Sequence, residues 1–172
     1  MAVSLAKNPQ TPMSKKKKFL YLLIAIFVII QFFRPEKNLG VRETENTIFV
    51  SNEVGQILQT SCFDCHSNYT VYPWYTNIQP FGWWMAHHVN EGKDELNFSE
   101  YEAYSLKRKL HKLEEIKEMV DESEMPLPSY LWIHGEATLT AEQKEILSKW
   151  VDETSKYLVD TLSRKKEQFQ SL

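Results

Sequence analysis

The stretch Cys62-Phe63-Asp64-Cys65-His66 decides how this chain is interpreted, because it holds the only two cysteines among 172 residues. Two thiols separated by two residues and followed directly by a histidine form the pattern of covalent c-type haem attachment. Each sulfur can add to one vinyl group of the porphyrin, and the next residue offers a ring nitrogen to the iron. The motif predicts one haem c, held by Cys62 and Cys65, with His66 as the proximal iron ligand.

Three other uses of the cysteine pair stay open. A redox dithiol of the thioredoxin type needs a βαβ pattern around the motif, and none is visible. A structural zinc ion needs four ligands, but the chain has no second cysteine pair. A disulfide between Cys62 and Cys65 would close too short a loop to stabilise the fold much. Haem attachment is therefore the favoured interpretation.

The first 33 residues differ in composition from the rest. Residues 1–18 contain five lysines and no acidic residue, and residues 19–33 form an uncharged apolar run. As a helix this run would rise about 22 Å, short of the roughly 30 Å bilayer core, but snorkelling of the flanking Lys18 and Arg34 can lengthen the effective span. No small-residue cleavage site follows the run. We therefore predict a cytoplasmic N-terminus over 1–18 and a transmembrane signal anchor over 19–33.

The distribution of charge predicts the location and the class of partner. The positive-inside rule keeps the lysines in the cytoplasm, so a single-pass anchor in the inner membrane would place the C-terminal domain in the periplasm. Residues 34–172 hold 15 basic and 23 acidic residues, a net charge of −8. So acidic a domain argues against nucleic acid as a partner, and we expect a membrane and a redox partner protein instead.

The residues after the anchor predict an all-α fold. Residues 34–46 contain Pro35 and Gly40 and are expected to form a linker, followed by the haem-binding domain over 47–172. Apolar spacing predicts a helix that starts near residue 47 and leads into Cys62, and further helices over 80–92, 99–120 and from 140 onward. Capping boxes at Ser99 and Thr140 support the starts of the last two. No stretch has the alternation of a sustained strand.

The second axial ligand of an iron must come from elsewhere in the chain. Met125 is the first candidate, because Pro126 and Pro128 keep its loop extended and can hold the thioether at a fixed point. His87 is the alternative; it and His88 point about 100° apart on a helix, so at most one of them can face the iron. His111 and His134 are weaker candidates, on a polar helix face and in a loop.

Aromatic residues follow the motif closely. Haem has large apolar faces, and stacked aromatic side chains cover such faces efficiently. The side chains expected to line the haem pocket are Trp74, Tyr75, Trp83 and Trp84, although a place in the ordinary core is an equally open interpretation.

Three stretches carry a resemblance to a known family: CFDCHSNYTVYPWYTNIQPFGWWMAHHVNEGKDELNFSEY from residue 62, EMPLPSYLWIH from 124 and LTAEQKEILSKW from 139. Over residues 47–155 the chain resembles the small membrane-anchored haem-binding domain proteins of Bacteroidetes-type bacteria. The resemblance implies a cytochrome-c-like fold with one covalent haem and a Met-Pro loop at Met125. It also implies that haem is joined on the outer side of the membrane. Leu127, where proline is common, and His88, where an acid is common, depart from the family pattern.

These observations predict an electron carrier or haem-binding module rather than an enzyme. Two strong axial ligands would leave no open iron position, and methionine as the second ligand would raise the reduction potential relative to two histidines. One rival is a haem sensor or peroxidase-like enzyme with an open distal site. The other is a haem-free, membrane-bound dithiol oxidoreductase.

Overall fold

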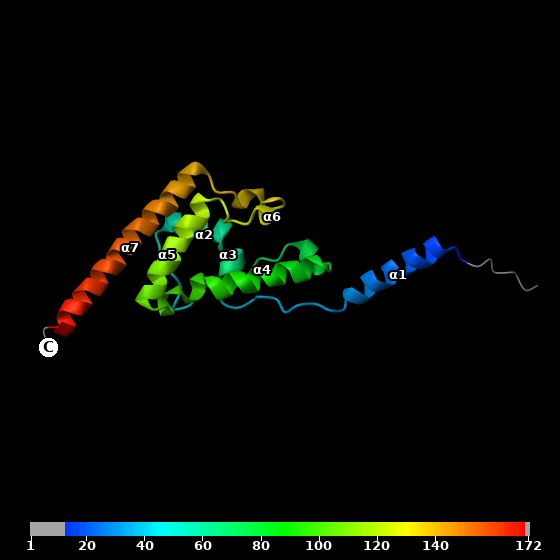
Figure 1. Cartoon of the computed structure of the whole chain (residues 1–172), viewed down its shortest axis with the longest axis horizontal. Helices are drawn as coiled ribbons and strands as arrows, with labels where there is room; N and C mark the ends of the chain where they lie inside the picture. The colour runs from blue at the N-terminus through cyan, green and yellow to red at the C-terminus, as the bar shows by residue number, and fades with distance from the viewer. Residues whose placement is uncertain (1–12, 171–172) are drawn as a thin grey trace, which may run out of the picture.

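The computed structural model describes residues 13–170, and within this range every regular element is helical (Figure 1). The chain forms α1 (Lys15–Ile30), α2 (Asn52–Ser61), α3 (Phe63–His66), α4 (Phe81–Glu95), α5 (Leu106–Asp121), α6 (Pro128–Leu131) and α7 (Ala141–Gln170). Three short 3₁₀ helices join them: η1 (Trp74–Asn77), η2 (Phe98–Ala103) and η3 (Gly135–Ala137). The all-α prediction is confirmed, since extended backbone pairs only at an isolated bridge between Leu39 and Tyr69 in the described range.

The main core lies where α2, α5 and α7 meet. Leu58 of α2, Leu113 of α5 and Leu147 of α7 are almost completely buried in one apolar cluster. These three helices present apolar side chains at helical spacing, so each buries one stripe against the others. The long α7 packs along α5 and then runs on beyond the body (Figure 1).

The short helix α3 lies between this core and α4. Its Phe63 packs against Phe98 of η2 with ring centroids 5.4 Å apart, and the ring of His66 meets the edge of Phe98 at 6.2 Å. On its other side α3 contacts α4. The motif therefore sits on a surface built by two elements that follow it in the sequence.

Helix boundaries correct parts of the sequence prediction. The helix before the motif starts at Asn52 rather than near residue 47, and α4 continues through Gly92 to Glu95. The expected helix start at Ser99 is also wrong: α5 begins at Leu106, where the Ser105 hydroxyl accepts from the amide of Arg108. The capping box at Thr140 is confirmed, since its amide donates to the side chain of Gln143 at 2.9 Å and its hydroxyl accepts from the Gln143 amide.

The stretch between α1 and the body lies against the domain. Asn38 donates its amide to the Tyr72 hydroxyl at 2.8 Å and its side chain to Thr70, and the Thr70 amide donates back to the Asn38 carbonyl. Further along, the Ser99 hydroxyl donates to the Arg42 carbonyl, which gives this buried serine its partner. Residues 38–42 are thus held in place by hydrogen bonds.

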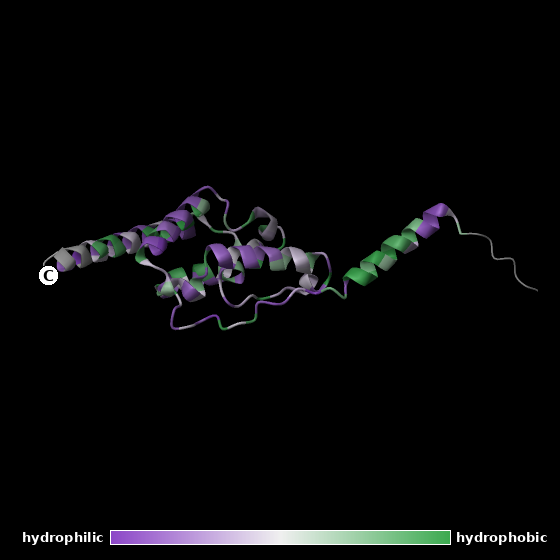
Figure 2. Ribbon diagram, turned by 60° about the horizontal axis from the view of Figure 1, so that its bottom comes forward, coloured by the Kyte–Doolittle hydropathy of each residue, from purple (hydrophilic) through white to green (hydrophobic). Residues whose placement is uncertain are grey.

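Helix α1 stands apart from the body, and most of its length is coloured as hydrophobic in Figure 2. None of its residues is buried, so its apolar side chains are exposed. It has 16 residues, of which the first four are lysines. Its apolar part would rise only about 18 Å against a bilayer core of about 30 Å. Within residues 13–170 none of the helices combines the length and the apolar character needed to cross a bilayer. This corrects the expectation of a transmembrane helix over 19–33.

Candidate functional site

The end of α2 and the single turn of α3 present the two cysteines. The amide of Cys62 still donates to Leu58 in α2, while the amides of Cys65 and His66 donate to the carbonyl of Cys62. Cys62 has φ of −128° and ends one helix where the next begins. Both thiols are free and partly buried. The break between the helices therefore leaves two thiols on one short, hydrogen-bonded turn.

His66 is held in one orientation by the backbone at the end of α4. Its Nδ1 lies 3.0 Å from the carbonyl oxygen of Leu96, so Nδ1 carries the proton and donates it. Burial lowers the pKa of His66, which keeps the ring neutral. The second nitrogen, Nε2, then has a free lone pair, as a proximal metal ligand requires.

Met125 lies in a loop whose start is fixed. The amides of Glu124 and Met125 donate to the carbonyl of Met119, and Ser123 takes a φ of 61°, which turns the chain sharply after α5. Lys144 of α7 donates to the Ser123 hydroxyl at 2.8 Å and to the Val120 carbonyl. The backbone that leads to Met125 is thus held by contacts from α5 and α7.

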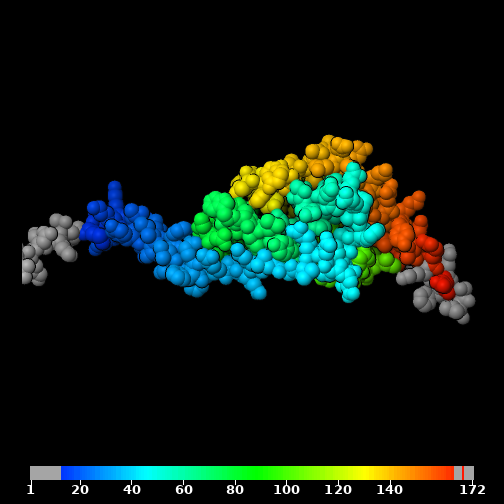
Figure 3. Space-filling model, turned by 180° about the vertical axis from the view of Figure 1, so that it is seen from behind, coloured from blue at the N-terminus to red at the C-terminus, as the bar shows by residue number. Residues whose placement is uncertain are grey.

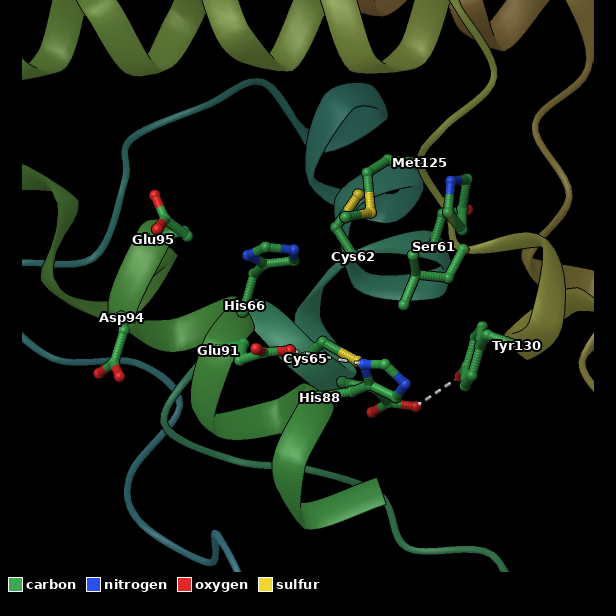
Figure 4. Close-up of a pocket in the computed structure, with 14 residues that line it drawn as sticks. Ser61, Cys62, Cys65, His66, His88, Glu91, Asp94, Glu95, Met125 and Tyr130 are labelled. Atoms are coloured by element: carbon green, nitrogen blue, oxygen red, sulfur yellow. Dashed lines mark hydrogen bonds and ion pairs between the residues drawn. The ribbon is translucent and has the colours of Figure 1, made fainter. Parts of the chain in front are cut away.

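Two adjoining cavities meet at these residues. One has a volume of about 480 Å³ and the other about 250 Å³, and both are lined by Cys62, His66 and Met125. Figure 4 shows the ring of His66 directed toward Cys62 and Met125, with Cys65 on the near side of the same turn. The structure therefore brings together all four residues that the sequence predicted as haem attachment points and iron ligands.

Asp64, the middle of the motif, connects the cavity wall to α6. Its carboxylate accepts a hydrogen bond from the Tyr130 hydroxyl at 3.1 Å, the dashed line at Tyr130 in Figure 4. It accepts another from the amide of Val71. Its carbonyl accepts from the hydroxyl of Thr70 at 2.7 Å. Burial and the neighbouring Asp64 raise the pKa of Tyr130, so its hydroxyl stays protonated and remains a donor. The sequence gives no local signal for this contact, because Asp64 and Tyr130 lie 66 positions apart.

The two cavities differ in character. The larger one is bordered by the acidic side chains of Glu91, Asp94 and Glu95, all on the last turns of α4. The smaller one is lined mostly by apolar side chains, among them Phe98, Ile116 and Met119, and it is also bordered by Glu95, Lys112 and Glu115. A ligand that fills both would have an apolar part inside and an edge beside acidic groups.

The histidine candidates take different places. His87 lies outside the lining of both cavities, is 64 % exposed and pairs with Glu91 at 3.2 Å. His88 lines the larger cavity, and burial lowers its pKa. His111 is exposed and pairs with Glu115. His134 stacks on Tyr130 and shares a hydrogen bond with the Tyr75 hydroxyl at 2.8 Å.

The aromatic residues expected to form the pocket lie elsewhere. Trp74, Tyr75, Trp83 and Trp84 are outside the lining of both cavities. Tyr75 of η1 is buried and its hydroxyl shares a hydrogen bond with His134 after α6, whereas Trp74 is 76 % exposed. The walls use Tyr130, Phe98 and aliphatic side chains instead, which no local motif in the sequence identifies.

The alternative of a protein-bound metal ion finds no support in the described part of the chain. No group of three or more His, Cys, Asp or Glu side chains between residues 13 and 170 could hold such an ion. An iron inside a porphyrin needs only the axial ligands from the protein. The donor set at this site, two thiols, one imidazole and one thioether, fits that requirement.

Comparison with known proteins agrees with this chemistry. A family model described as a haem-binding domain matches residues 25–153, three quarters of the chain. No curated protein and no solved structure matches the chain.

Proposed function

Because this chain belongs to the haem-binding domain family, we propose that it is a membrane-tethered c-type cytochrome that carries one covalent haem and transfers electrons. The observation that carries the proposal is that Cys62, His66 and Met125 line the same two adjoining cavities, with Cys65 on the same turn. Together the cavities fall in the range of about 300–1,000 Å³ that is usual for ligand sites. A cytochrome-c-like arrangement of the helices is part of the proposal.

Each residue has a distinct role in such a site. Cys62 and Cys65 would form the thioether bonds, and His66 would bind iron through Nε2 while its Nδ1–H donates to Leu96. That hydrogen bond fixes the tautomer and raises the basicity of the ligand. Met125, whose loop is held by Lys144, would be the second iron ligand. Bound haem supplies one-electron redox chemistry.

A closed iron site favours electron transfer over substrate chemistry. With His66 and Met125 both bound, no coordination position remains for a substrate. Glu91, Asp94 and Glu95 border the larger cavity and give its edge a negative charge. Such a surface attracts a basic patch on a redox partner and speeds their encounter.

Location completes the proposal. The apolar surface of α1, together with Lys15–Lys18 at the start of the helix, would tether the domain to the inner membrane. The domain would lie in the periplasm, the side on which the resemblance implies that haem is joined. Protease added to spheroplasts should then digest the domain, whereas full protection would contradict this location.

The central test is covalent attachment of haem. The chain is expressed with a c-type maturation system, denatured and separated by electrophoresis, and the gel is stained for haem peroxidase activity. We expect stain on the wild-type band, weaker stain for Cys62→Ala and Cys65→Ala, and none for the double variant. His87→Ala is the matched control, because this exposed side chain lies outside the cavities. A colourless wild-type band would overturn the proposal.

A further inference from the structure

Four of the five tryptophans gather at the end of the body nearest α1. Trp74 lies in η1, Trp83 and Trp84 in the first turn of α4, and Trp132 directly after α6. The hydrogen bond between the Tyr75 hydroxyl and His134 holds η1 beside the segment after α6, and Figure 3 shows these green and yellow segments next to one another. The fifth tryptophan, Trp150, packs against the core instead.

These tryptophans are exposed together with other apolar side chains. Trp132 is 85 % exposed and Trp74 76 %. The group, called here the aromatic edge, consists of Trp74, Ile78, Phe81, Trp83, Trp84, Trp132 and Ile133. Exposed apolar side chains that gather in one region of the surface are typical of an interaction site.

The aromatic edge is also free of charge. Residues 67–86 and 125–135 contain no Asp, Glu, Lys or Arg, although the chain from residue 34 onward has a net charge of −8. A lipid headgroup layer favours such a surface, because tryptophan places its apolar rings toward the acyl chains and its indole N–H toward water.

The segment that directly follows α1 is hydrogen-bonded to the body at this same edge. Gln31, which follows α1, accepts from the Gln79 amide at 2.9 Å and donates to the Gln79 carbonyl at 3.2 Å. The indole of Trp83 donates to the carbonyl of Phe33 at 2.7 Å. The apolar surface of α1 therefore continues through the exposed Phe32 and Phe33 into the edge. Lipid that surrounds α1 would reach the aromatic edge as well.

We propose that the aromatic edge rests in the headgroup region of the bilayer and fixes the orientation of the domain. This inference rests on the proposed membrane tether. Phe81 starts α4 at the edge, whereas Glu91, Asp94 and Glu95 lie at its other end, about 15–20 Å further along the helix. The acidic border of the cavity is thus held away from the membrane and accessible to a partner.

The distribution of tryptophan provides the experiment. Helix α1 contains none, so contact between lipid and tryptophan reports the domain alone. The full haem-loaded chain is reconstituted in phosphatidylcholine–phosphatidylglycerol vesicles with bromine near the top of the acyl chains, and in identical vesicles without bromine. We expect tryptophan emission to be about twofold lower in the brominated vesicles.

Two variants test whether the quenched tryptophans are those of the aromatic edge. Replacing Trp74, Trp84 and Trp132 together by Phe should remove most of the difference between the two vesicle types. Trp150→Phe is the matched control and should increase the quenched fraction, since it removes a core reporter.

The outcomes separate this inference from the proposed function. A chain that floats with the vesicles but shows equal emission in both would overturn the inference and leave the tether intact; the edge would then belong to a protein partner. A chain that does not float overturns both the tether and the inference, while haem attachment is judged independently by the stain.

Discussion

Gly92 of α4 packs against Cys65 so closely that a Cβ atom on Gly92 would lie 2.8 Å from the Cys65 carbonyl oxygen. It would also lie 3.2 Å from the Cys65 Cβ atom. Backbone cannot move away as the end of a flexible side chain can, so only glycine permits this approach of α3 and α4. The contact fixes the second cysteine of the motif against the helix that carries the acidic border of the cavity.

Gly92→Ala should therefore destabilise the domain. Alanine gains about 1 kcal/mol of helix propensity over glycine, but the clash with Cys65 costs about 1–3 kcal/mol and outweighs it. We expect a net loss of about 1 kcal/mol in the free energy of unfolding, measured by urea denaturation. Gly135→Ala is the control, because a methyl group on Gly135 would meet nothing within 4 Å. Equal or greater stability for Gly92→Ala would show that α3 and α4 can separate freely.

The same glycine shows where sequence reasoning succeeds and where it stops. Thr140 with Gln143 and the apolar stripe of α7 are local patterns, and the structure has that helix as predicted. From the sequence, Gly92 is expected to end its helix. In the structure the glycine is needed for the close approach to Cys65, a residue that is distant in sequence and so leaves no local signal. Ser99 is likewise expected to cap a helix. Its hydroxyl instead donates to the carbonyl of Arg42, 57 positions away in the sequence.

The site follows the same division. Cys62, Cys65 and His66 are close together in sequence, so their role follows from spacing alone, and Met125 could be proposed because Pro126 and Pro128 follow it. The walls come from residues that only the fold brings together, such as Asp64 with Tyr130. Trp83 and Trp84 follow the motif closely in sequence but lie at the start of α4, whereas the acidic residues that border the cavity lie at its end. The length of the helix separates the two groups in space.

Tyr130→Phe should loosen the wall of the larger cavity. It removes the donor to the Asp64 carboxylate, and a hydrogen bond to a charged acceptor in this partly buried position contributes about 1 kcal/mol. We expect that loss in urea denaturation of the haem-loaded protein. Tyr157→Phe, on an exposed position of α7, should change stability by less than about 0.5 kcal/mol. If the two variants behave alike, the Asp64 contact contributes nothing to the wall.

Thiol reactivity tests the dithiol alternative. Burial, with Cys65 nearby, raises the pKa of Cys62 to about 12, and burial with Asp64 nearby raises the pKa of Cys65 to about 11. A raised pKa removes thiolate, so at pH 8 only about one thiol in 1,000 to 10,000 is reactive. In the haem-free chain at pH 8, alkylation by iodoacetamide should be about 250- to 2,500-fold slower than for a free cysteine peptide, of which about one quarter is thiolate at that pH. The rate should rise about tenfold per pH unit up to pH 10. Fast alkylation at pH 7 would favour a redox dithiol.

Met125→Ala tests whether the iron site is closed. The thioether lines both cavities together with His66, so its removal should leave haem attached but open one coordination position. We expect the absorption spectrum to change from low-spin to high-spin, the reduction potential to fall, and the reduced protein to bind carbon monoxide rapidly, which the wild type should not do. Met119→Ala is the matched control, since Met119 lines only the smaller cavity.

An unaltered low-spin spectrum in Met125→Ala would show that another residue binds the iron. His88 would then be the first residue to replace, because it lines the larger cavity. Rapid, stoichiometric binding of carbon monoxide by the wild type would instead show that the site is open and that the protein is a sensor or peroxidase-like enzyme.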